Sequence, residues 1–275
     1  RGLDALNYAC YQDARFIIAG TPSGVTLAPE GGAHQSIGTP LIGISQDGLA
    51  SFEPAFADEL ARIMQWSFDY LQRDGEGDPD ERTWLRDETG GSVYLRLSTR
   101  PVEQALRSDD PEFDQGVIDG AYWLRRSGPN PDVILAYQGA VAPDVIEAAG
   151  RIGQDRRDIG VLAITSADRL NAGWTAAKRA RQRGHKSAKA WIERMLAPIP
   201  RDCTIVTAID GHPLTLGWLG AVGGHPTVPL GVEHFGQTGR VSDLYHHYGI
   251  DADGIVSAVH EITMGRPVRL VGKFN

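Results

Sequence analysis

The sequence predicts an α/β protein in which strands alternate with helices to give a mostly parallel sheet. Residues 133–139 and 159–164 are short, nearly uninterrupted apolar runs, as is typical of parallel strands buried on both faces. A helical pattern over 142–153 separates them, which fits a strand–helix–strand unit. Similar elements occur upstream, so we expect two α/β units, over residues 1–108 and 109–275.

The first unit is predicted to contain two helices and three short strands, and a polar stretch over 105–115 marks its end. The strongest helix covers about 54–72, because apolar side chains recur at helical spacing and Pro54 occupies the first turn. We interpret Glu53 and Asp58 as acids that favour the positive end of this helix dipole, by about 0.3–1 kcal/mol each. The other expected elements are a helix over 3–14, a buried parallel strand over 15–20 and strands over 41–44 and 93–97.

The second unit is predicted to contain four strands with helices between them. Pro229 lacks an N–H and therefore confines the fourth strand to a sheet edge. The expected strands cover 133–139, 159–164, 203–208 and 227–231, and the expected helices cover 142–153, 173–196, 213–222, 242–248 and 253–264.

The composition excludes several classes of protein. The chain has 275 residues, of which 41% are hydrophobic and 23% charged, as is normal for a globular protein. Its net charge of −8 argues against nucleic acid or an anionic membrane as the main partner, because phosphates need a basic surface. The sequence contains no long apolar run, so we expect no membrane span. Cys10 and Cys203 provide no disulfide framework, and we expect a cytoplasmic protein.

The loop over 26–36 is the first candidate site. It follows the predicted strand over 15–20, and in α/β sheets ligands bind outside the carboxyl ends of strands. Gly31 and Gly32 allow the backbone to approach a ligand closely, and His34 can donate or accept a proton near neutral pH. A solvent-exposed histidine without a role is the more common alternative in such a loop.

Two further segments carry candidate residues. Arg100 follows the strand over 93–97, where a guanidinium can clamp an anionic substrate, although an ordinary surface ion pair is an equally good interpretation. The segment over 231–239 is interpreted mainly as structural, because its glycines fit turns and Phe235 fits packing in the core. His234 in this segment is a further candidate for contact with substrate.

Metal and phosphate motifs are not evident in the sequence. The eight histidines show no helical pair with an acid between them, so we predict no metal site. The glycines of 220–224 are not followed by the Lys-Ser/Thr that a phosphate-binding loop requires.

The hexapeptide Glu30-Gly31-Gly32-Ala33-His34-Gln35 resembles the Glu-Asp-Gly-(two residues)-His-Gln loop of the transketolase superfamily, with one residue fewer and glycine in place of aspartate. The segment over 38–60, which contains Glu53-Pro54-Ala55-Phe56, is most similar to the homodimeric pyruvate dehydrogenase decarboxylating component. The resemblance covers nearly the whole chain. It implies the second half of a pyrimidine-binding domain over 1–108 and a transketolase-type C-terminal domain over 109–275.

The resemblance also implies roles for particular residues. The family's loop histidine lines the substrate channel and stabilises charge on the substrate or intermediate, its strand-end arginine meets the substrate, and the segment over 231–249 is similar to the family's C-terminal pattern. The implied site residues are catalytic His34, substrate-binding Gln35, Arg100 and His234, and cofactor-binding Glu30, Gly31 and Gly32.

The function implied by the resemblance is oxidative decarboxylation of a 2-oxo acid, pyruvate first, with thiamine diphosphate and Mg²⁺. The acyl group would pass to a lipoyl-bearing acyltransferase. Transketolase-type ketol transfer between sugar phosphates and a non-catalytic assembly module are the alternatives. The family's Gly-Asp-Gly…Asn motif does not occur, so both cofactors are expected to be bound mainly by regions absent from this chain. Arg1 resembles the interior of a helix, so we expect the rest of the same polypeptide, or a companion chain, in a homodimer.

Overall fold

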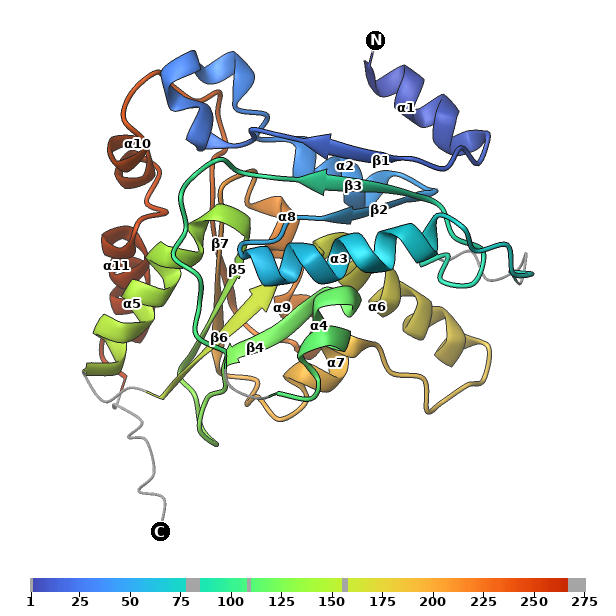
Figure 1. The fold of residues 1–275 in the computed structure, drawn as a ribbon. Coiled ribbons are helices and arrows are strands. Elements are labelled where there is room, and N and C mark those ends of the chain that lie inside the picture. Colours follow the sequence, from blue (N-terminus) through green and yellow to red (C-terminus); the bar gives the residue numbers. More distant parts are fainter. Residues whose placement is uncertain (1, 78–84, 108–109, 155–157, 267–275) are drawn as a thin grey trace.

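The computed structural model describes residues 2–77, 85–107, 110–154 and 158–266, and it confirms the α/β class. Two sheets form two units, and the carboxyl ends of their strands meet (Figure 1). Glu53, which follows a strand of the first unit, donates its backbone N–H to the carbonyl of Thr165, which follows a strand of the second, at 2.8 Å. The strand ends of both sheets therefore share one region of the molecule.

The first unit is a three-stranded parallel sheet of order β1–β3–β2. Its strands are β1 (Ile17–Gly20), β2 (Leu49–Phe52) and β3 (Ser92–Arg96), and its helices are α1 (Gly2–Tyr11), α2 (Thr39–Ser45) and α3 (Ala57–Tyr70). β1 lies at an edge and Ile18 is 38% exposed, so the strand predicted over 15–20 exists but is not buried.

The strand predicted over 41–44 is wrong, because these residues belong to helix α2. A short apolar run cannot by itself distinguish a strand from a buried helical segment. Pro40 decides the outcome, since it occupies the first turn of α2, where its fixed φ favours a helix start. The strand that pairs with β3 is instead β2, whose four residues are all buried.

The second unit is a five-stranded sheet of order β4–β6–β5–β7–β8, in which only β4 is antiparallel to its neighbour. The sheet is therefore mostly parallel, and β8 lies at an edge, as predicted. Its strands are β4 (Ala121–Arg125), β5 (Val133–Gln138), β6 (Ile159–Ile164), β7 (Thr204–Ile209) and β8 (Thr227–Leu230). Its helices are α4 (Phe113–Asp119), α5 (Ala142–Gln154), α6 (Ala167–Gln182), α7 (Trp191–Leu196), α8 (Leu214–Gly217), α9 (Gly220–Gly223), α10 (Val241–His247) and α11 (Ala252–Thr263), with the 3₁₀ turn η3 (Gly139–Val141).

The central strands of the larger sheet divide the core into two apolar layers. Along β5, Val133, Leu135 and Tyr137 face the layer that includes α5 and α11, while Ile134 and Ala136 face the layer that includes α6 and α7 (Figure 1). The first layer continues into the smaller unit, so the two units share one apolar core. Among the described residues, no helix combines the length and the apolar character that a membrane crossing needs.

Candidate functional site

Three loops meet beyond the carboxyl ends of β7 and β8. The His212 N–H donates to the carbonyl of Ile37 at 2.8 Å, and the Val232 N–H donates to the carbonyl of Gly211 at 2.8 Å. The Nε2 atom of Gln35 donates to the carbonyl of Gln237 at 3.0 Å. We call the meeting point of residues 30–38, 211–213 and 231–238 the histidine rim, because each loop carries one histidine: His34, His212 and His234.

The loop that carries His34 folds as two short 3₁₀ segments, η1 (Val25–Glu30) and η2 (Gly32–His34), joined at Gly31. Gly31 has φ of 100°, a conformation that other residues rarely adopt. A Cβ on Gly32 would lie 1.6 Å from the carbonyl oxygen of Gly236, so this glycine serves the contact between two loops. The predicted cofactor role of Glu30, Gly31 and Gly32 stays a prediction, and the packing against Gly236 already accounts for Gly32.

His34 and Gln35 point to different environments. The His34 side chain is exposed, whereas Gln35 is fully buried under the loop over 235–238. Gln35 also accepts the Gly24 N–H through its backbone carbonyl at 3.0 Å, which anchors the loop. His34 is therefore free to contact a ligand, while Gln35 holds the loop that presents it.

The segment over 231–239 lies against the His34 loop, and His234 is exposed. The placement of Phe235 in the core was wrong, because this side chain is 82% exposed. The reason is local: the backbone next to it, at Gly236, packs directly on Gln35, so the neighbouring ring is turned outward. Sequence reasoning missed His212, although it follows a buried strand by three residues, which is the same signal that selected the His34 loop.

Arg100 is partly buried and paired within the chain. Its Nη1 atom donates to the Asp144 carboxylate at 2.6 Å and to the carbonyl of Ala140 at 3.0 Å, and its guanidinium lies 4.6 Å from the centre of the Tyr245 ring. A substrate carboxylate would have to displace Asp144 to reach it. The substrate role of Arg100 thus stays a prediction that requires this exchange.

A buried polar network links the two units behind the histidine rim, and the sequence did not predict it. Arg96, at the end of β3, forms an ion pair with Glu53 and donates to the carbonyl of Asp210 at 2.7 Å. Gln138 donates to Glu53 at 2.9 Å, and Tyr245 donates to the Asp210 carboxylate at 3.0 Å. We call Glu53, Arg96, Gln138, Asp210 and Tyr245 the interdomain network. All five side chains are buried.

The electrostatics of the interdomain network follow from its burial. Desolvation raises the pKa of Glu53, and the nearby Arg96 guanidinium partly offsets this rise. Burial likewise raises the pKa of Asp210, against the opposing effect of Arg96. The interpretation of Glu53 as an acid at a helix start was wrong, since it directly follows β2, four residues before α3, and is 5% exposed.

Asp58 does lie in the first turn of α3, as predicted. Its carboxylate also accepts two hydrogen bonds from Arg107, at 2.7 and 2.9 Å, and these hydrogen bonds lower the pKa of Asp58. Its neighbour Glu59 is buried and accepts the backbone N–H groups of Ala55 and Phe56, at 2.7 and 2.9 Å. These contacts fix the start of α3 and leave neither acid open to a ligand.

The interdomain network also holds the His34 loop at both ends. The Val25 N–H donates to the Asp210 carboxylate at 2.7 Å, and the Nε atom of Arg96 donates to the Thr39 hydroxyl at 3.0 Å. Val25 is thereby attached to Asp210 of the second unit, and Thr39 is attached to Arg96 of the first unit, which itself donates to the carbonyl of Asp210. The buried charges position the loop that exposes the histidine.

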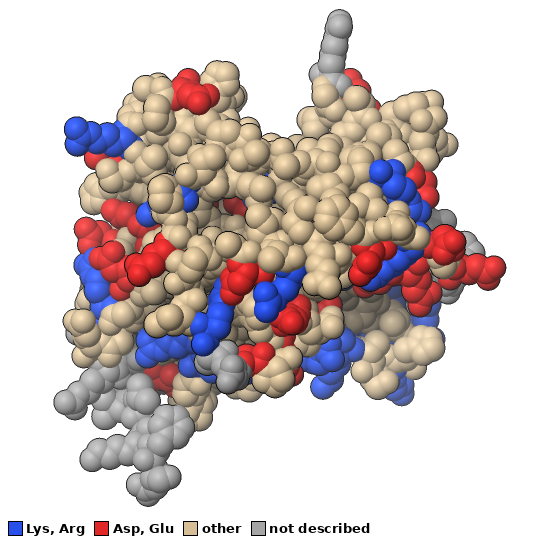
Figure 2. Space-filling model, in the orientation of Figure 1, with Lys and Arg blue, Asp and Glu red and all other residues tan. Residues whose placement is uncertain are grey.

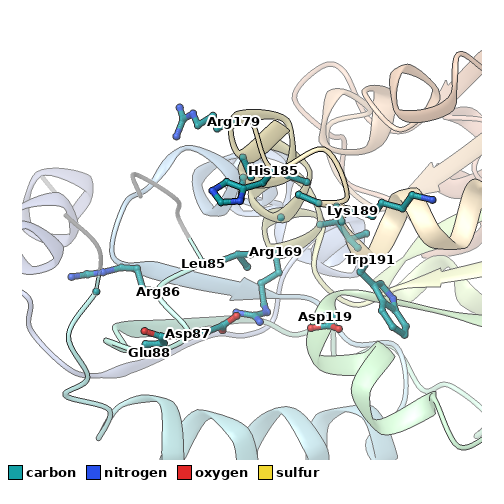
Figure 3. Close-up of a pocket in the computed structure, with 18 of the residues that line it drawn as sticks. Leu85, Arg86, Asp87, Glu88, Asp119, Arg169, Arg179, His185, Lys189 and Trp191 are labelled. Atoms are coloured by element: carbon teal, nitrogen blue, oxygen red, sulfur yellow. The ribbon is translucent and has the colours of Figure 1, made fainter. Parts of the chain in front are cut away.

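A cleft of about 1090 Å³ lies away from the histidine rim, between α6 and the segment over 85–89 (Figure 3). Arg169 points across it to Asp87, at 2.9 Å, and is itself almost fully buried. Its walls therefore hold opposite charges that pair with each other.

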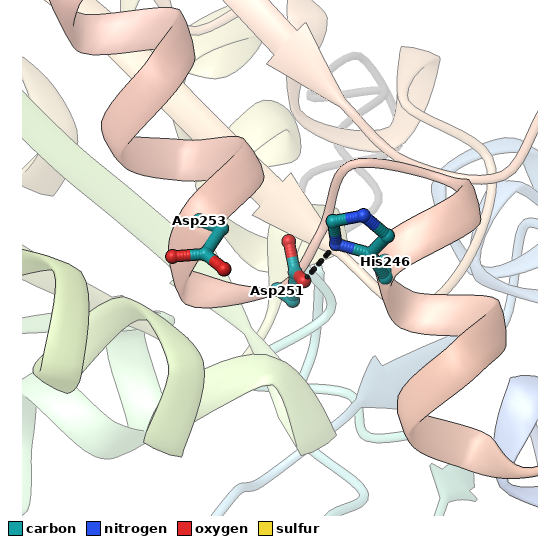
Figure 4. A group of neighbouring side chains, drawn as sticks. All are labelled: His246, Asp251 and Asp253. Carbon is teal, nitrogen blue, oxygen red and sulfur yellow. Dashed lines mark hydrogen bonds and ion pairs between the residues drawn. The ribbon is translucent and has the colours of Figure 1, made fainter.

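His246, Asp251 and Asp253 form a group whose potential ligand atoms lie within 4.8 Å of one another (Figure 4). Each acid already has a partner: Asp251 caps α11 through the Gly254 N–H at 2.8 Å, and Asp253 pairs with Arg151 at 2.7 Å. The hydrogen bond between the His246 ring and the accepting Asp251 carboxylate raises the pKa of His246. The group is explained as a helix cap with flanking ion pairs.

Comparison with known proteins shows what the second unit is similar to. Residues 120–251 match the family model described as the transketolase-like TK C-terminal domain. The chain is 26% identical over 270 residues to the pyruvate dehydrogenase E1 component of Mycolicibacterium smegmatis, covering 93% of this chain and 27% of the relative. It is 20% identical over 259 residues to transketolase 2 of Escherichia coli, covering 94% of this chain and 33% of the relative. The chain thus spans about a quarter to a third of the length of these relatives.

Solved structures agree on the fold. Transketolase from Leishmania mexicana superposes with a TM-score of 0.70 at 16% identity, over 99% of this chain and 34% of that chain. A structure described as a split gene transketolase, inactive beta4 tetramer, superposes with a TM-score of 0.62 at 20% identity, over 97% of this chain and 73% of that chain. The transketolase-type C-terminal α/β fold expected from the sequence is confirmed.

Proposed function

Because this chain belongs to the transketolase superfamily, we propose that it forms the C-terminal part of a thiamine-diphosphate-dependent 2-oxo acid dehydrogenase. Pyruvate is the first substrate to test. The acyl product would pass to a lipoyl-bearing acyltransferase. The observation that carries the proposal is the histidine rim, in which two segments that resemble the family lie together and expose His34 and His234.

The described residues do not by themselves form a site for thiamine diphosphate and Mg²⁺. The His246 group is the one potential metal cluster in the described ranges, and its acids are engaged by a helix cap and by Arg151. We propose that both cofactors are bound mainly by polypeptide outside this chain, and we derive no step through them. What this chain contributes is an exposed imidazole at His34, held by the buried Gln35, that can donate a hydrogen bond to charge developing on a substrate.

An uncharged surface supports a companion polypeptide, or a second copy of the chain, next to the histidine rim. Residues 2–46 contain only four charged side chains, Asp4, Asp13, Arg15 and Glu30. The corresponding upper face in Figure 2 is almost free of charge. The exposed large apolar side chains of this segment are Leu3, Tyr8, Tyr11 and Ile18, and Leu214 at the start of α8 and Phe235 in the loop after β8 are exposed as well. Such a surface is typical of a protein interface.

Two other functions are considered as alternatives to 2-oxo acid decarboxylation. For ketol transfer between sugar phosphates, a substrate phosphate would have to displace Asp144 to reach Arg100, as a substrate carboxylate would, so this arginine does not distinguish the two reactions. A non-catalytic assembly role has one supporting parallel, the split gene transketolase described as an inactive beta4 tetramer. In that case this chain would need a separate polypeptide to gain activity.

The test is a decarboxylation assay of the complete enzyme with a panel of 2-oxo acids, with and without thiamine diphosphate. We expect His34→Ala to lower turnover by about 10²-fold or more, the usual contribution of an acid–base group. His260→Ala, which removes an exposed histidine of α11, is the matched control and should leave turnover unchanged. Full activity of His34→Ala would remove this residue from the site, and transfer from sugar phosphates alone would favour the transketolase alternative.

A further inference from the structure

Positive charge is concentrated in one short part of this acidic chain. Residues 178–194, at the end of α6 and through α7, contain seven Lys and Arg side chains and one acid, Glu193. The whole chain has a net charge of −8, so this segment differs in sign from the rest of the molecule. A local cationic surface on an acidic protein needs an explanation of its own.

A cavity of about 410 Å³ opens beside this segment, between α7, α9 and the residues that precede β7. Four cations surround it: Arg181, Lys186, Lys189 and Arg201. Apolar side chains, among them Leu196, Ile199 and Val222, supply much of the remaining lining. Its volume lies in the range of small-molecule sites, which are typically mostly apolar with a few placed polar groups.

One of the four cations holds the cavity in shape. Arg181 binds both carboxylate oxygens of Glu193, at 3.0 and 2.8 Å, and donates to the carbonyl of Ala188 at 2.7 Å. Glu193 also accepts the Ala190 N–H at 2.8 Å. The turn that carries Lys186 and Lys189 is thus fixed by a bidentate ion pair before any ligand arrives.

The other three cations are available. Lys186, Lys189 and Arg201 are exposed, and the described residues offer none of them an ion-pair partner. Lys189 also borders the cleft of Figure 3, so it stands at the junction of two hollows. Among the described residues that line the cavity, the one acid is Glu193, and it is paired with Arg181. The cavity therefore carries a surplus of positive charge.

A buried histidine completes the lining. His225 is 7% exposed, and burial lowers its pKa, against the opposing effect of the nearby backbone of Cys203 and Pro200. Its Nδ1 atom has no well-formed hydrogen bond to the described residues. The imidazole of His225 is therefore a buried polar group in the wall of the cavity.

The cavity is separate from the histidine rim. His225 and Arg201 precede β8 and β7, whereas Asp210 and His212 follow β7. Six residues of β7 lie between the two places, or about 20 Å at the usual rise of a strand. A ligand in the cavity would not compete with a substrate at the rim.

We propose that this cavity binds a phosphorylated small molecule. A phosphate group carries up to two negative charges and several acceptor oxygens, which match three unpaired cations better than a single carboxylate does. The guanidinium of Arg201 and the ammonium groups of Lys186 and Lys189 bind the phosphate, and the apolar lining takes the organic part. The inference concerns a second site and does not depend on the reaction at the rim.

Calorimetric titration of the chain with phenyl phosphate and with inorganic phosphate tests the proposal. The variant Lys186→Ser/Lys189→Ser/Arg201→Ser should raise the dissociation constant of phenyl phosphate by at least about tenfold, because it removes three charge-assisted contacts. Lys178→Ser is the control: this lysine lies over the Trp174 ring and lines neither hollow. It removes charge from the same segment, and it should change the constant by less than about twofold.

Amide spectra locate the ligand. Addition of phenyl phosphate should shift the amide NMR resonances of Lys189, Val222 and Gly223. In the calorimetric titration, phenyl phosphate should bind more tightly than inorganic phosphate. The proposal is overturned if phenyl phosphate fails to bind at about millimolar concentration. It is equally overturned if the triple variant binds as well as the parent, or if Lys178→Ser weakens binding as much as the triple variant, since that would indicate a diffuse surface for an extended polyanion.

Discussion

The interdomain network and the histidine rim lie next to each other and use polar residues in opposite ways. In the network, the Arg96 and Glu53 side chains are 3% and 6% exposed and pair with each other. In the rim, His34 and His234 are exposed and make no side-chain hydrogen bond among the described residues. Polar groups of the first kind hold the two units together, and those of the second kind are free to meet a ligand.

This difference explains how an exposed loop can have a defined position. The loop over 25–39 has few apolar anchors of its own beyond η1, and its ends are held by Asp210 and Arg96 through Val25 and Thr39. A site needs such support, because side chains on unsupported loops are poorly placed for chemistry. Changes in the network should therefore alter folding, whereas changes in the rim should alter function alone.

The largest expected effect is the loss of Arg96. In Arg96→Met, Glu53 remains buried, and Gln138 is the side-chain partner left to it among the described residues. Breaking a buried ion pair typically costs about 3–5 kcal/mol. Urea unfolding followed by circular dichroism measures the loss. The double variant Arg96→Met/Glu53→Gln removes the unpaired charge and should recover part of it. Equal stability of the single and double variants would show that the charge of Glu53 is not what the arginine balances.

The second effect concerns Asp168, another buried acid at the contact between the units. Its carboxylate accepts the Ser51 N–H at 3.0 Å, and burial raises its pKa to about 7. A raised pKa means that the folded state holds the proton more tightly. Stability is therefore greatest below the ordinary pKa of about 4 and falls as the pH rises to about 7.

Asp168→Asn tests this dependence. Each unit of pKa shift is worth about 1.4 kcal/mol, so the loss between pH 4 and 7 is on the order of a few kcal/mol. The variant cannot lose its proton, and its unfolding free energy should change less over this range than that of the parent. The buried acids Glu53, Glu59 and Asp210 have raised pKa values too and contribute to the pH dependence of both proteins. The difference between parent and variant in the slope of unfolding free energy against pH therefore reports on Asp168 alone. Identical slopes would contradict the prediction.

The same contrast between buried and exposed groups explains which elements could be predicted from the sequence. The strands over 133–139, 159–164 and 203–208 were predictable because parallel strands buried on both faces form nearly continuous apolar runs. β4 was missed, since Ala121–Arg125 is an edge strand whose exposure increases toward a charged end. Edge elements leave a weaker pattern because only part of their surface is buried.

The loops of the candidate site could be predicted from the sequence, but the interdomain network that holds them could not. The segments around His34 and His234 were both selected, and they do lie together. Their support depends on the pairing of Glu53 with Arg96, residues 43 positions apart. Locally, Glu53 looks like an acid before a helix, and nothing in the neighbouring residues distinguishes that role from a buried ion pair. Pairings across two sheets depend on tertiary structure, which a local pattern does not contain.

A moderate effect is expected from Tyr245→Phe. The variant removes the hydroxyl that donates to the Asp210 carboxylate at 3.0 Å, and it leaves the ring beneath Arg100. A buried hydrogen bond of this kind contributes about 1–2 kcal/mol. Hydrogen exchange should also become faster at the Val25 amide, which shares the same carboxylate. Unchanged exchange at Val25 would mean that Asp210 holds the loop without help from the tyrosine.

The smallest effect on stability is expected at the rim itself. His34→Ala and His234→Ala replace exposed side chains and should each change the free energy of unfolding by less than about 0.5 kcal/mol. Gln35→Ala is the matched comparison. The Gln35 side chain lies next to His34 in the sequence but is fully buried and donates to the carbonyl of Gln237, so its loss should lower the free energy of unfolding by about 1 kcal/mol or more. Urea unfolding of the three variants side by side measures the order. If His34→Ala lowered the free energy of unfolding as much as Gln35→Ala does, the His34 imidazole would be a stabilising part of the fold. That result would contradict the interpretation that this side chain is available to bind a ligand.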